Sequence, residues 1–193
     1  MKKIILVASV LFSMTAFSQG TLKKGDTQLN AGLGFSAWGT PVFLGLDYGL
    51  DNNFTLGGEI SYRSYSNNFS KYYELNYTII GLGANANYHF NEVLDLPSKW
   101  DLYGGASLNY FIWSNSFKYS GKPEYASDFN PNYANSSGVG FGLQAGVRYF
   151  FNNHWAINLE TGGGSIFGGK IGLTYKFGNS GSGSYSKPKS KKK

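Results

Sequence analysis

Lys170-Ile171-Gly172-Leu173-Thr174-Tyr175-Lys176-Phe177 alternates at every position between an apolar residue and a polar or small one. One face of this stretch carries the isoleucine, leucine, tyrosine and phenylalanine, and the other carries lysine, glycine and threonine. A period of two is that of a β-strand whose two faces meet different surroundings. The stretch therefore predicts a final strand with one apolar and one polar face.

The ending of this stretch recurs along the chain. Strand ends of the form Tyr-x-Leu/Phe occur at Tyr48-Gly49-Leu50, Tyr88-His89-Phe90, Tyr149-Phe150-Phe151 and Tyr175-Lys176-Phe177. After each of the first three, the chain turns and resumes with an aromatic residue. Aromatic rings gather at the surfaces of a membrane, so the pattern predicts one belt on the periplasmic side. Its members are Tyr48, Phe54, Tyr88, Phe90, Trp100, Tyr149, Phe151, Trp155, Tyr175 and Phe177.

Seven further stretches alternate in the same way. With the last strand, the expected strands cover residues 25–37, 42–50, 54–63, 80–90, 100–112, 139–151, 155–161 and 170–177. Two long connections, 64–76 and 114–137, follow odd-numbered strands, whereas the connections after even-numbered strands are short. This asymmetry is typical of outer-membrane barrels, whose long loops lie outside the cell. The fold class predicted is all-β, an eight-stranded antiparallel up-and-down transmembrane β-barrel with both barrel termini in the periplasm.

A soluble eight-stranded barrel is the alternative, since it also alternates, with its apolar face turned inward around a ligand. Its solvated exterior would then be the face rich in glycine and asparagine, where lysine, glutamate and threonine are more usual. Glycine suits the inside of a narrow barrel, where large side chains do not fit. The membrane barrel is therefore favoured.

Over residues 25–177, the pattern resembles the small outer-membrane β-barrel superfamily, which includes OmpX-like and OmpA-transmembrane-domain-like proteins. The last strand resembles the β-signal that closes such barrels. The resemblance implies a location in the cell outer membrane of a Gram-negative bacterium, contact with outer-membrane lipid, and insertion by the barrel-assembly machinery. Members of the superfamily act as adhesins, scaffolds, channels or lipid-modifying enzymes, so the resemblance implies no single activity.

Three segments divide the chain. Residues 1–18 have the basic start, apolar run and small-residue exit of a signal peptide. Residues 19–177 form the barrel, without cysteine. Residues 178–193 read as a flexible Gly/Ser linker that ends in Lys187, Lys189, Lys191, Lys192 and Lys193. This tail is expected in the periplasm, either as a solvated end or as a tether for an anionic surface or a periplasmic partner.

The net charge of +6 arises outside the barrel. Of 17 lysines and arginines, two lie in the leader and five in the tail, which leaves ten against 11 acidic residues. No basic face accompanies the tail, so nucleic-acid binding is not indicated.

The inward face carries three acidic and three basic side chains, which are expected to form a charge network. They are Asp47, Glu59, Glu160, Arg63, Arg148 and Lys170. The stagger of barrel strands makes a mutual cluster of Glu160, Arg148 and Lys170 plausible. Such a network either acts as a gate or proton-linked element, or neutralises a closed interior, and neutralisation is favoured because buried charges need partners.

No residue is expected to act in catalysis or to hold a cofactor or metal. His89 and His154 lie at periplasmic strand ends, where they are expected as interfacial histidines at turns, with no Ser-His-Asp grouping near the loops. The tyrosine-, serine- and asparagine-rich long loops suit either surface recognition or capping of the barrel. The sequence thus predicts a non-enzymatic barrel with a structural, surface-recognition or scaffolding role. A narrow channel or a binder of small hydrophobic molecules is the second interpretation, and a lipid-modifying enzyme is the third.

Overall fold

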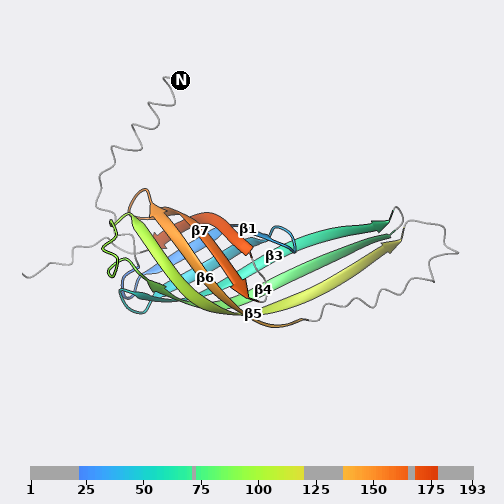
Figure 1. The fold of residues 1–193 in the computed structure, drawn as a ribbon, viewed down its shortest axis with the longest axis horizontal. Coiled ribbons are helices and arrows are strands. Elements are labelled where there is room, and N and C mark those ends of the chain that lie inside the picture. The colour runs from blue at the N-terminus through green and yellow to red at the C-terminus, as the bar shows by residue number, and fades with distance from the viewer. Residues whose placement is uncertain (1–21, 71–72, 120–136, 165–167, 178–193) are drawn as a thin grey trace, which may run out of the picture.

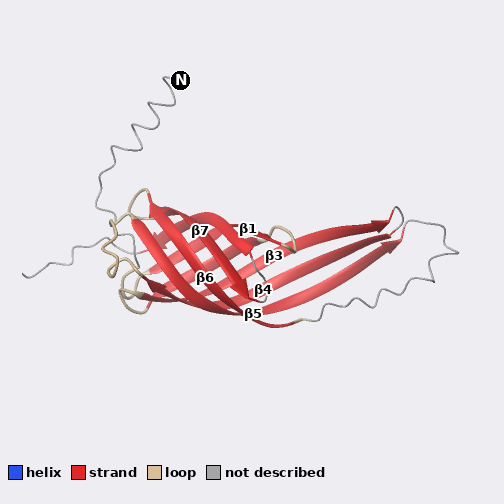
Figure 2. Cartoon of the chain, in the orientation of Figure 1, coloured by secondary structure: helices blue, strands red, loops and turns tan. Residues whose placement is uncertain are grey.

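The fold is a closed barrel of eight antiparallel strands, as predicted (Figure 1). It is seen in a computed structural model that describes residues 22–70, 73–119, 137–164 and 168–177. The strands are β1 (Thr27–Ser36), β2 (Val42–Gly49), β3 (Phe54–Ser70), β4 (Tyr73–His89), β5 (Trp100–Tyr119), β6 (Gly138–Phe150), β7 (Trp155–Gly164) and β8 (Gly168–Phe177). None of the described segments forms a helix with the length and hydrophobicity of a membrane span. Figure 2 shows strands joined by turns throughout this part of the chain.

The last strand closes the barrel by pairing with the first. β1 and β8 run antiparallel, with Gln28 opposite Lys176 and Leu33 opposite Ile171. Gly32 lies opposite Gly172, and a Cβ atom on Gly32 would lie 2.2 Å from the backbone oxygen of Ile171. The two glycines therefore permit a close approach of the strands at the point of closure.

The alternation of the sequence separates the two faces of the wall. Outward side chains such as Leu44, Leu82 and Leu173 are 48%, 45% and 48% exposed, so the outer face of the wall is apolar. Inward side chains such as Gln28 and Thr174 are fully buried. The facing predicted for the barrel strands is therefore confirmed.

One end of the barrel carries the short connections, and we call it the turn end. β1 begins and β8 ends there as well, at the left in Figure 1. The expected leader, residues 1–18, and the tail, residues 178–193, lie outside the described residues.

At the opposite end, β3, β4 and β5 continue beyond the other strands as a three-stranded sheet, which we call the extension (Figure 1). β3 pairs with β2 as far as Tyr62 but runs on to Ser70, so eight of its residues project past β2, a length of about 26 Å. The expected loop at residues 64–76 is therefore wrong, because most of it is strand. The expected loop at 114–137 is wrong at its start, since β5 reaches Tyr119, and residues 120–136 lie outside the described part.

The extension has the opposite polarity to the barrel wall, which explains the error. On β3, the outward side changes from Ile60 and Tyr62 to Ser64 and Ser66, while the inward side changes from Glu59, Ser61 and Arg63 to Tyr65. β4 and β5 change in the same way. Their inward residues there are Leu75, Tyr77, Ile79, Phe111, Trp113 and, as a polar exception, Asn115, and their outward residues are Asn76, Thr78, Ser114 and Ser116. The alternation persists, but its outer face is polar. A sequence analysis that identifies strands by apolar, lipid-facing residues therefore assigns these residues to a loop.

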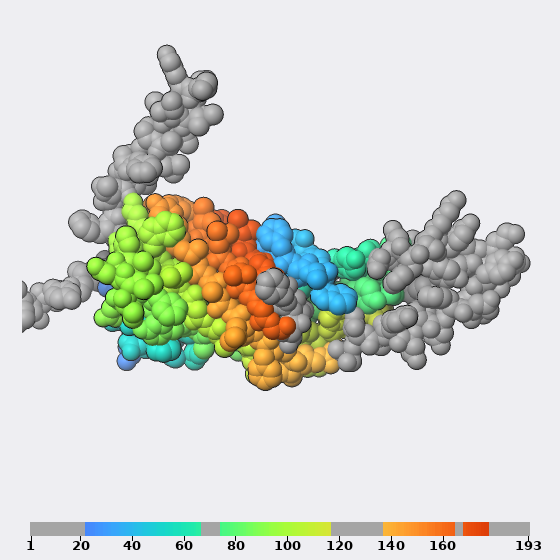
Figure 3. All heavy atoms as spheres, viewed as in Figure 1, coloured from blue at the N-terminus to red at the C-terminus, as the bar shows by residue number. Residues whose placement is uncertain are grey.

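The connection between β1 and β2 covers part of the inner face of the extension. Trp38 packs edge-on against Trp113, with ring centroids 5.3 Å apart, and against Tyr77 at 6.4 Å. Figure 3 shows the blue surface of this connection beside the green surface of the extension. Tyr77 and Ile79 are 8% and 1% exposed, so this face is a packed aromatic surface rather than a solvated loop.

Candidate functional site

Arg148 of β6 is the centre of a buried ionic cluster near the turn end. Its Nη1 lies 3.0 Å from Oδ2 of Asp101, its direct cross-strand neighbour on β5, and its Nη2 lies 3.0 Å from Oδ2 of Asp47 on β2. All three side chains are at most 5% exposed. One guanidinium thus bridges two carboxylates from opposite parts of the wall.

Both carboxylates accept further hydrogen bonds from the wall. Asp47 accepts from the amides of Gln28, at 2.8 Å, and Asn30, at 2.9 Å, both on β1. Asp101 meets Nδ1 of His89 at 2.6 Å. We call Asp47, His89, Asp101 and Arg148 the turn-end cluster. Its carboxylates are well satisfied, as buried charges require.

A second cluster lies in the middle of the barrel. Nζ of Lys170 on β8 lies 2.7 Å from Oε2 of Glu59 on β3 and 3.0 Å from Oε1 of Glu160 on β7. We call these three residues the mid-barrel triad. Its side chains are 17% to 31% exposed, and two carboxylates share one ammonium, so the triad carries a net negative charge when all three groups are ionised.

Tyr103 of β5 stands between the two clusters. Its hydroxyl donates a hydrogen bond to Oε2 of Glu160 over 2.9 Å, and the guanidinium carbon of Arg148 lies 4.1 Å from its ring centroid. The ring is 2% exposed. Hydrogen bonds and a cation-π contact therefore run without interruption from the turn end to the middle of the barrel.

The charged side chains were expected to form one network, but most of them lie in two clusters, and some partners differ from those expected. All six predicted charges face inward, and Glu160 and Lys170 meet as expected, but Arg148 pairs with Asp47 and Asp101 instead of joining them. Asp101 was absent from the prediction. Pairing of the belt aromatics would have revealed it, because Trp100 lies opposite Tyr149 and the next pair inward is then Asp101 and Arg148.

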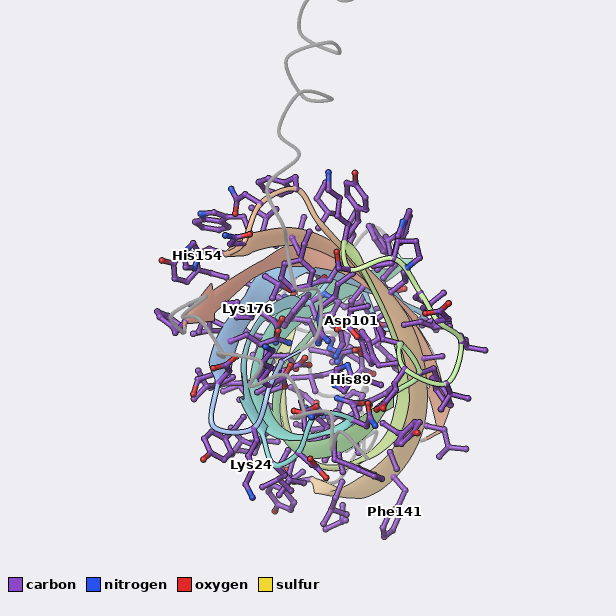
Figure 4. The ribbon with its side chains drawn as sticks, turned by 90° about the vertical axis from the view of Figure 1, so that its left-hand side faces the viewer. Lys24, His89, Asp101, Phe141, His154 and Lys176 are labelled. Carbon is purple, nitrogen blue, oxygen red and sulfur yellow. The ribbon has the colours of Figure 1, made fainter. Side chains whose placement is uncertain are left out.

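His89 lies inside the barrel, so its expected place as an interfacial histidine at a turn is wrong. It is fully buried, and Figure 4 shows it within the wall beside Asp101. Its Nε2 lies 3.1 Å from Oγ1 of Thr55. Thr55, His89 and Asp101 thus form a hydroxyl, imidazole and carboxylate series of the kind that activates nucleophiles. Thr55 is 1% exposed, and neither cavity described below is lined by Thr55 or His89, so the hydroxyl is enclosed within the wall.

His154 does lie at a turn, between β6 and β7. Its Nδ1 is 3.0 Å from the backbone oxygen of Lys176, and its ring stacks on Tyr175 with centroids 5.7 Å apart. In Figure 4 it lies at the edge of the barrel, whereas Lys176 points to the inside. His154 therefore holds the end of β8 against the neighbouring turn.

The aromatic residues of the predicted belt lie around the turn end and contact one another across strands. Ring centroids are 5.0 Å apart for Phe54 and Tyr88, 4.9 Å for Trp100 and Tyr149, and 4.8 Å for Trp155 and Tyr175. Within one strand, Tyr88 meets Phe90 at 5.0 Å and Tyr175 meets Phe177 at 4.9 Å. Such edge-on pairs stiffen this end of the wall.

Two cavities inside the barrel are lined by described residues. One, of about 30 Å³, lies among the charged residues of the two clusters and has room for only a few water molecules. The other, of about 120 Å³, lies toward the extension and is lined by residues that include Ser36, Glu59, Arg63, Asn109, Phe111 and Lys170. No group of histidine and acidic side chains suited to a metal ion occurs among the described residues.

Comparison with known proteins agrees with this architecture. The family model described as "Outer membrane protein beta-barrel domain" matches residues 4–186. The crystal structure of OprG from Pseudomonas aeruginosa is similar, with a TM-score of 0.59 and 16% identity over 83% of this chain and 99% of that one. This likeness concerns the fold alone.

Two other solved barrels resemble the chain more distantly. The N-terminal barrel of OprF from Pseudomonas aeruginosa has a TM-score of 0.49 and 14% identity over 81% of this chain and 100% of that one. Neisserial surface protein A has a TM-score of 0.46 and 17% identity over 79% and 95%. No curated protein matches the chain. Because the family match covers nearly the whole sequence, this protein belongs to the outer-membrane β-barrel domain family.

Proposed function

We propose that this protein is a non-enzymatic barrel that does not conduct, and that it presents the extension outside the cell as a recognition surface. The observation that carries this proposal is the change of polarity along β3, β4 and β5. Outward residues change from Ile60 and Tyr62 to Ser64 and Ser66, which suits a wall that leaves lipid and enters water. The turn end, with both barrel termini, then faces the periplasm.

The composition of the extension supports recognition. Its outer face carries short polar side chains, and those of Ser64, Ser66 and Ser116 are exposed. Its inner face is packed, since Tyr77 is 8% exposed and lies against Trp38. Serine and asparagine side chains supply adaptable hydrogen bonds of the kind found in surfaces that bind other macromolecules. The strands are held by pairing, with Ser64 opposite Thr78, so the outer side chains are presented on a preformed sheet.

The filled interior supports a closed barrel. Arg148, Tyr103 and Lys170 cross the lumen between the turn end and the middle, and the cavity among them is about 30 Å³. An eight-stranded barrel has an interior just wide enough for side chains, and these side chains occupy it. A binder of small molecules is the second candidate, because the larger cavity of about 120 Å³ remains toward the extension.

The absence of cysteine from the sequence allows a direct test of orientation. Ser116→Cys in the extension and Asn52→Cys in a turn are each labelled with a membrane-impermeant maleimide on intact cells. We expect Ser116→Cys to react at once and Asn52→Cys to react only after the outer membrane is permeabilised. The reverse pattern would reject an extracellular extension.

Recognition is then tested on the same cells with a photo-crosslinking residue in place of Ser66 or, as a control on the packed inner face, Tyr77. We expect a saturable cross-link from position 66 that position 77 does not give. Equal cross-linking from both positions would contradict recognition by the outer face. A steady current through the purified protein would separately contradict the closed interior.

A further inference from the structure

Arg63 is a buried cation whose bonding differs from that of Arg148 and Lys170. Arg148 and Lys170 each meet two carboxylates at 3.0 Å or less. Arg63 is 6% exposed and, among the described residues, it has one hydrogen bond, from Nη1 to Oγ of Ser36 at 3.0 Å, and no ion pair. Its Nε has no partner. A guanidinium has five N–H donors, so most of its bonding capacity is unused.

The nearest acidic residue on the same strand is already engaged. Glu59 lies four positions from Arg63, a separation of about 13 Å along β3, and its carboxylate is held by Lys170. Burying a charge without close partners is costly unless something else supplies them. The structure thus leaves a place for an anion beside Arg63.

Space for such an anion is present. Arg63 lines the larger cavity, whose volume of about 120 Å³ exceeds that of a few water molecules and admits a carboxylate with a short apolar body. The lining also includes the apolar side chains Phe111 and Pro41. Toward the extension the surroundings become apolar, because Ile79 is the cross-strand neighbour of Arg63 and Trp113 is that of Ile79.

The mid-barrel triad selects among anions. Glu59, Glu160 and Lys170 line the same cavity on the side away from the extension, and together they carry a net negative charge when all are ionised. A dianion such as phosphate is repelled more strongly by this wall than a monoanion is. The planar fork of a guanidinium also matches the two oxygens of a carboxylate.

From this cavity we propose that the barrel binds a small amphiphilic monocarboxylate. The carboxylate lies on Arg63 and the apolar body lies against Phe111, which lines the same cavity. The site is separate from the recognition surface of the extension and does not depend on it.

The test uses the full-length protein in lipid nanodiscs and hexanoate as the probe, with binding followed by saturation-transfer NMR. We expect saturable binding, with hexylammonium and inorganic phosphate at least tenfold weaker. Arg63→Gln should weaken hexanoate binding about tenfold or more, and Arg63→Lys less, because lysine keeps the charge but loses the fork. Lys24→Gln, which removes an exposed charge at the turn end, should leave binding unchanged.

A further variant separates ligand binding from a structural role of Arg63. Glu59→Gln removes negative charge from the cavity wall and should strengthen hexanoate binding, an effect that a merely structural arginine would not produce. Hexanoate should also raise the urea midpoint of the wild type and not that of Arg63→Gln. Equal binding by wild type and Arg63→Gln, binding of hexylammonium as tight as that of hexanoate, or no saturable binding to folded wild type would each overturn the proposal.

Discussion

The hydroxyl of Tyr103 donates a hydrogen bond to Glu160 over 2.9 Å and so connects the mid-barrel triad to the turn-end cluster. The other connection is made by the Tyr103 ring, which lies 4.1 Å from the guanidinium carbon of Arg148. β5 supplies both Tyr103 and Asp101, which contact Arg148 on β6 and Glu160 on β7. Arg148 and Glu160 in turn reach Asp47 on β2 and Lys170 on β8.

Arg148→Gln should lower the free energy of unfolding by about 3 to 5 kcal/mol, because it leaves Asp47 and Asp101 buried without their shared cation. Urea unfolding in lipid vesicles, followed by circular dichroism, measures the loss. The matched control is Lys24→Gln, an exposed charge whose removal should change stability by no more than about 0.5 kcal/mol. A loss below about 1 kcal/mol for Arg148→Gln would mean that water can replace the guanidinium.

Gly146→Ala should destabilise the barrel by about 1 to 3 kcal/mol through overpacking. The added Cβ would lie 2.3 Å from the Tyr103 ring, which is buried and held on both sides. Gly58→Ala is the control, since the nearest atom to its Cβ is 3.7 Å away. Tyr103→Leu should restore part of the stability lost by Gly146→Ala. Equal effects at Gly146 and Gly58 would show that the ring moves aside freely.

Leu82→Arg should cost about 2 to 4 kcal/mol near the middle of the membrane, because it places a charge on the lipid-facing side of β4. Gly83→Ser, on the inner side, should be milder, since the nearest atom to its Cβ is the amide oxygen of Asn109, at the end of a flexible side chain. The difference in stability is measured by refolding each of the two variants into lipid vesicles. Similar losses at the two neighbouring positions would contradict the facing of β4.

Planar bilayers containing the purified protein should show no stable large conductance. The lumen is crossed by Arg148, Tyr103 and Lys170. These side chains are held by carboxylates of the wall, namely Asp47, Glu160 and Glu59. Tyr103→Ala should give at most brief, small openings, because the two clusters remain. Steady porin-like currents through the wild type would reject the closed interior.

Deletion from residue 178 onward should leave assembly intact, because β8 ends at Phe177 and already pairs with β1 and β7. Heat-dependent mobility on gels reports assembly. Salt-sensitive association with periplasmic material should be lost, since the deletion removes Lys187, Lys189, Lys191, Lys192 and Lys193. Association that survives the deletion would contradict a tethering role of the tail. Failed assembly would show that the barrel needs residues beyond β8.

The sequence predicts the wall well and the contacts across the lumen poorly, for a physical reason. The side of the wall on which a side chain lies depends only on the alternation of the strand, which is kept by the apolar outward residues such as Leu44 and Leu82. A contact across the lumen depends on the stagger of all strands together, so the meeting of Arg148 with Asp47 could not be read from either strand alone. The extension was missed because its outer side carries polar residues such as Ser64 where the other strands carry the apolar residues by which they are recognised. Tyr65 and Tyr77 keep the alternation on the inner side.

The two binding sites proposed for the extension differ in the size of the molecule that each admits. The tip of the extension, near Ser70 and Tyr73, lies about 26 Å along β3 from the end of the pairing between β2 and β3. Arg63 lies at its base, on the inner side, and lines the larger cavity. In the two proposals, the hairpin of β3 and β4 therefore offers its outer face to a macromolecule and the inner side of its base to a small molecule, so that both can be occupied at once without competing.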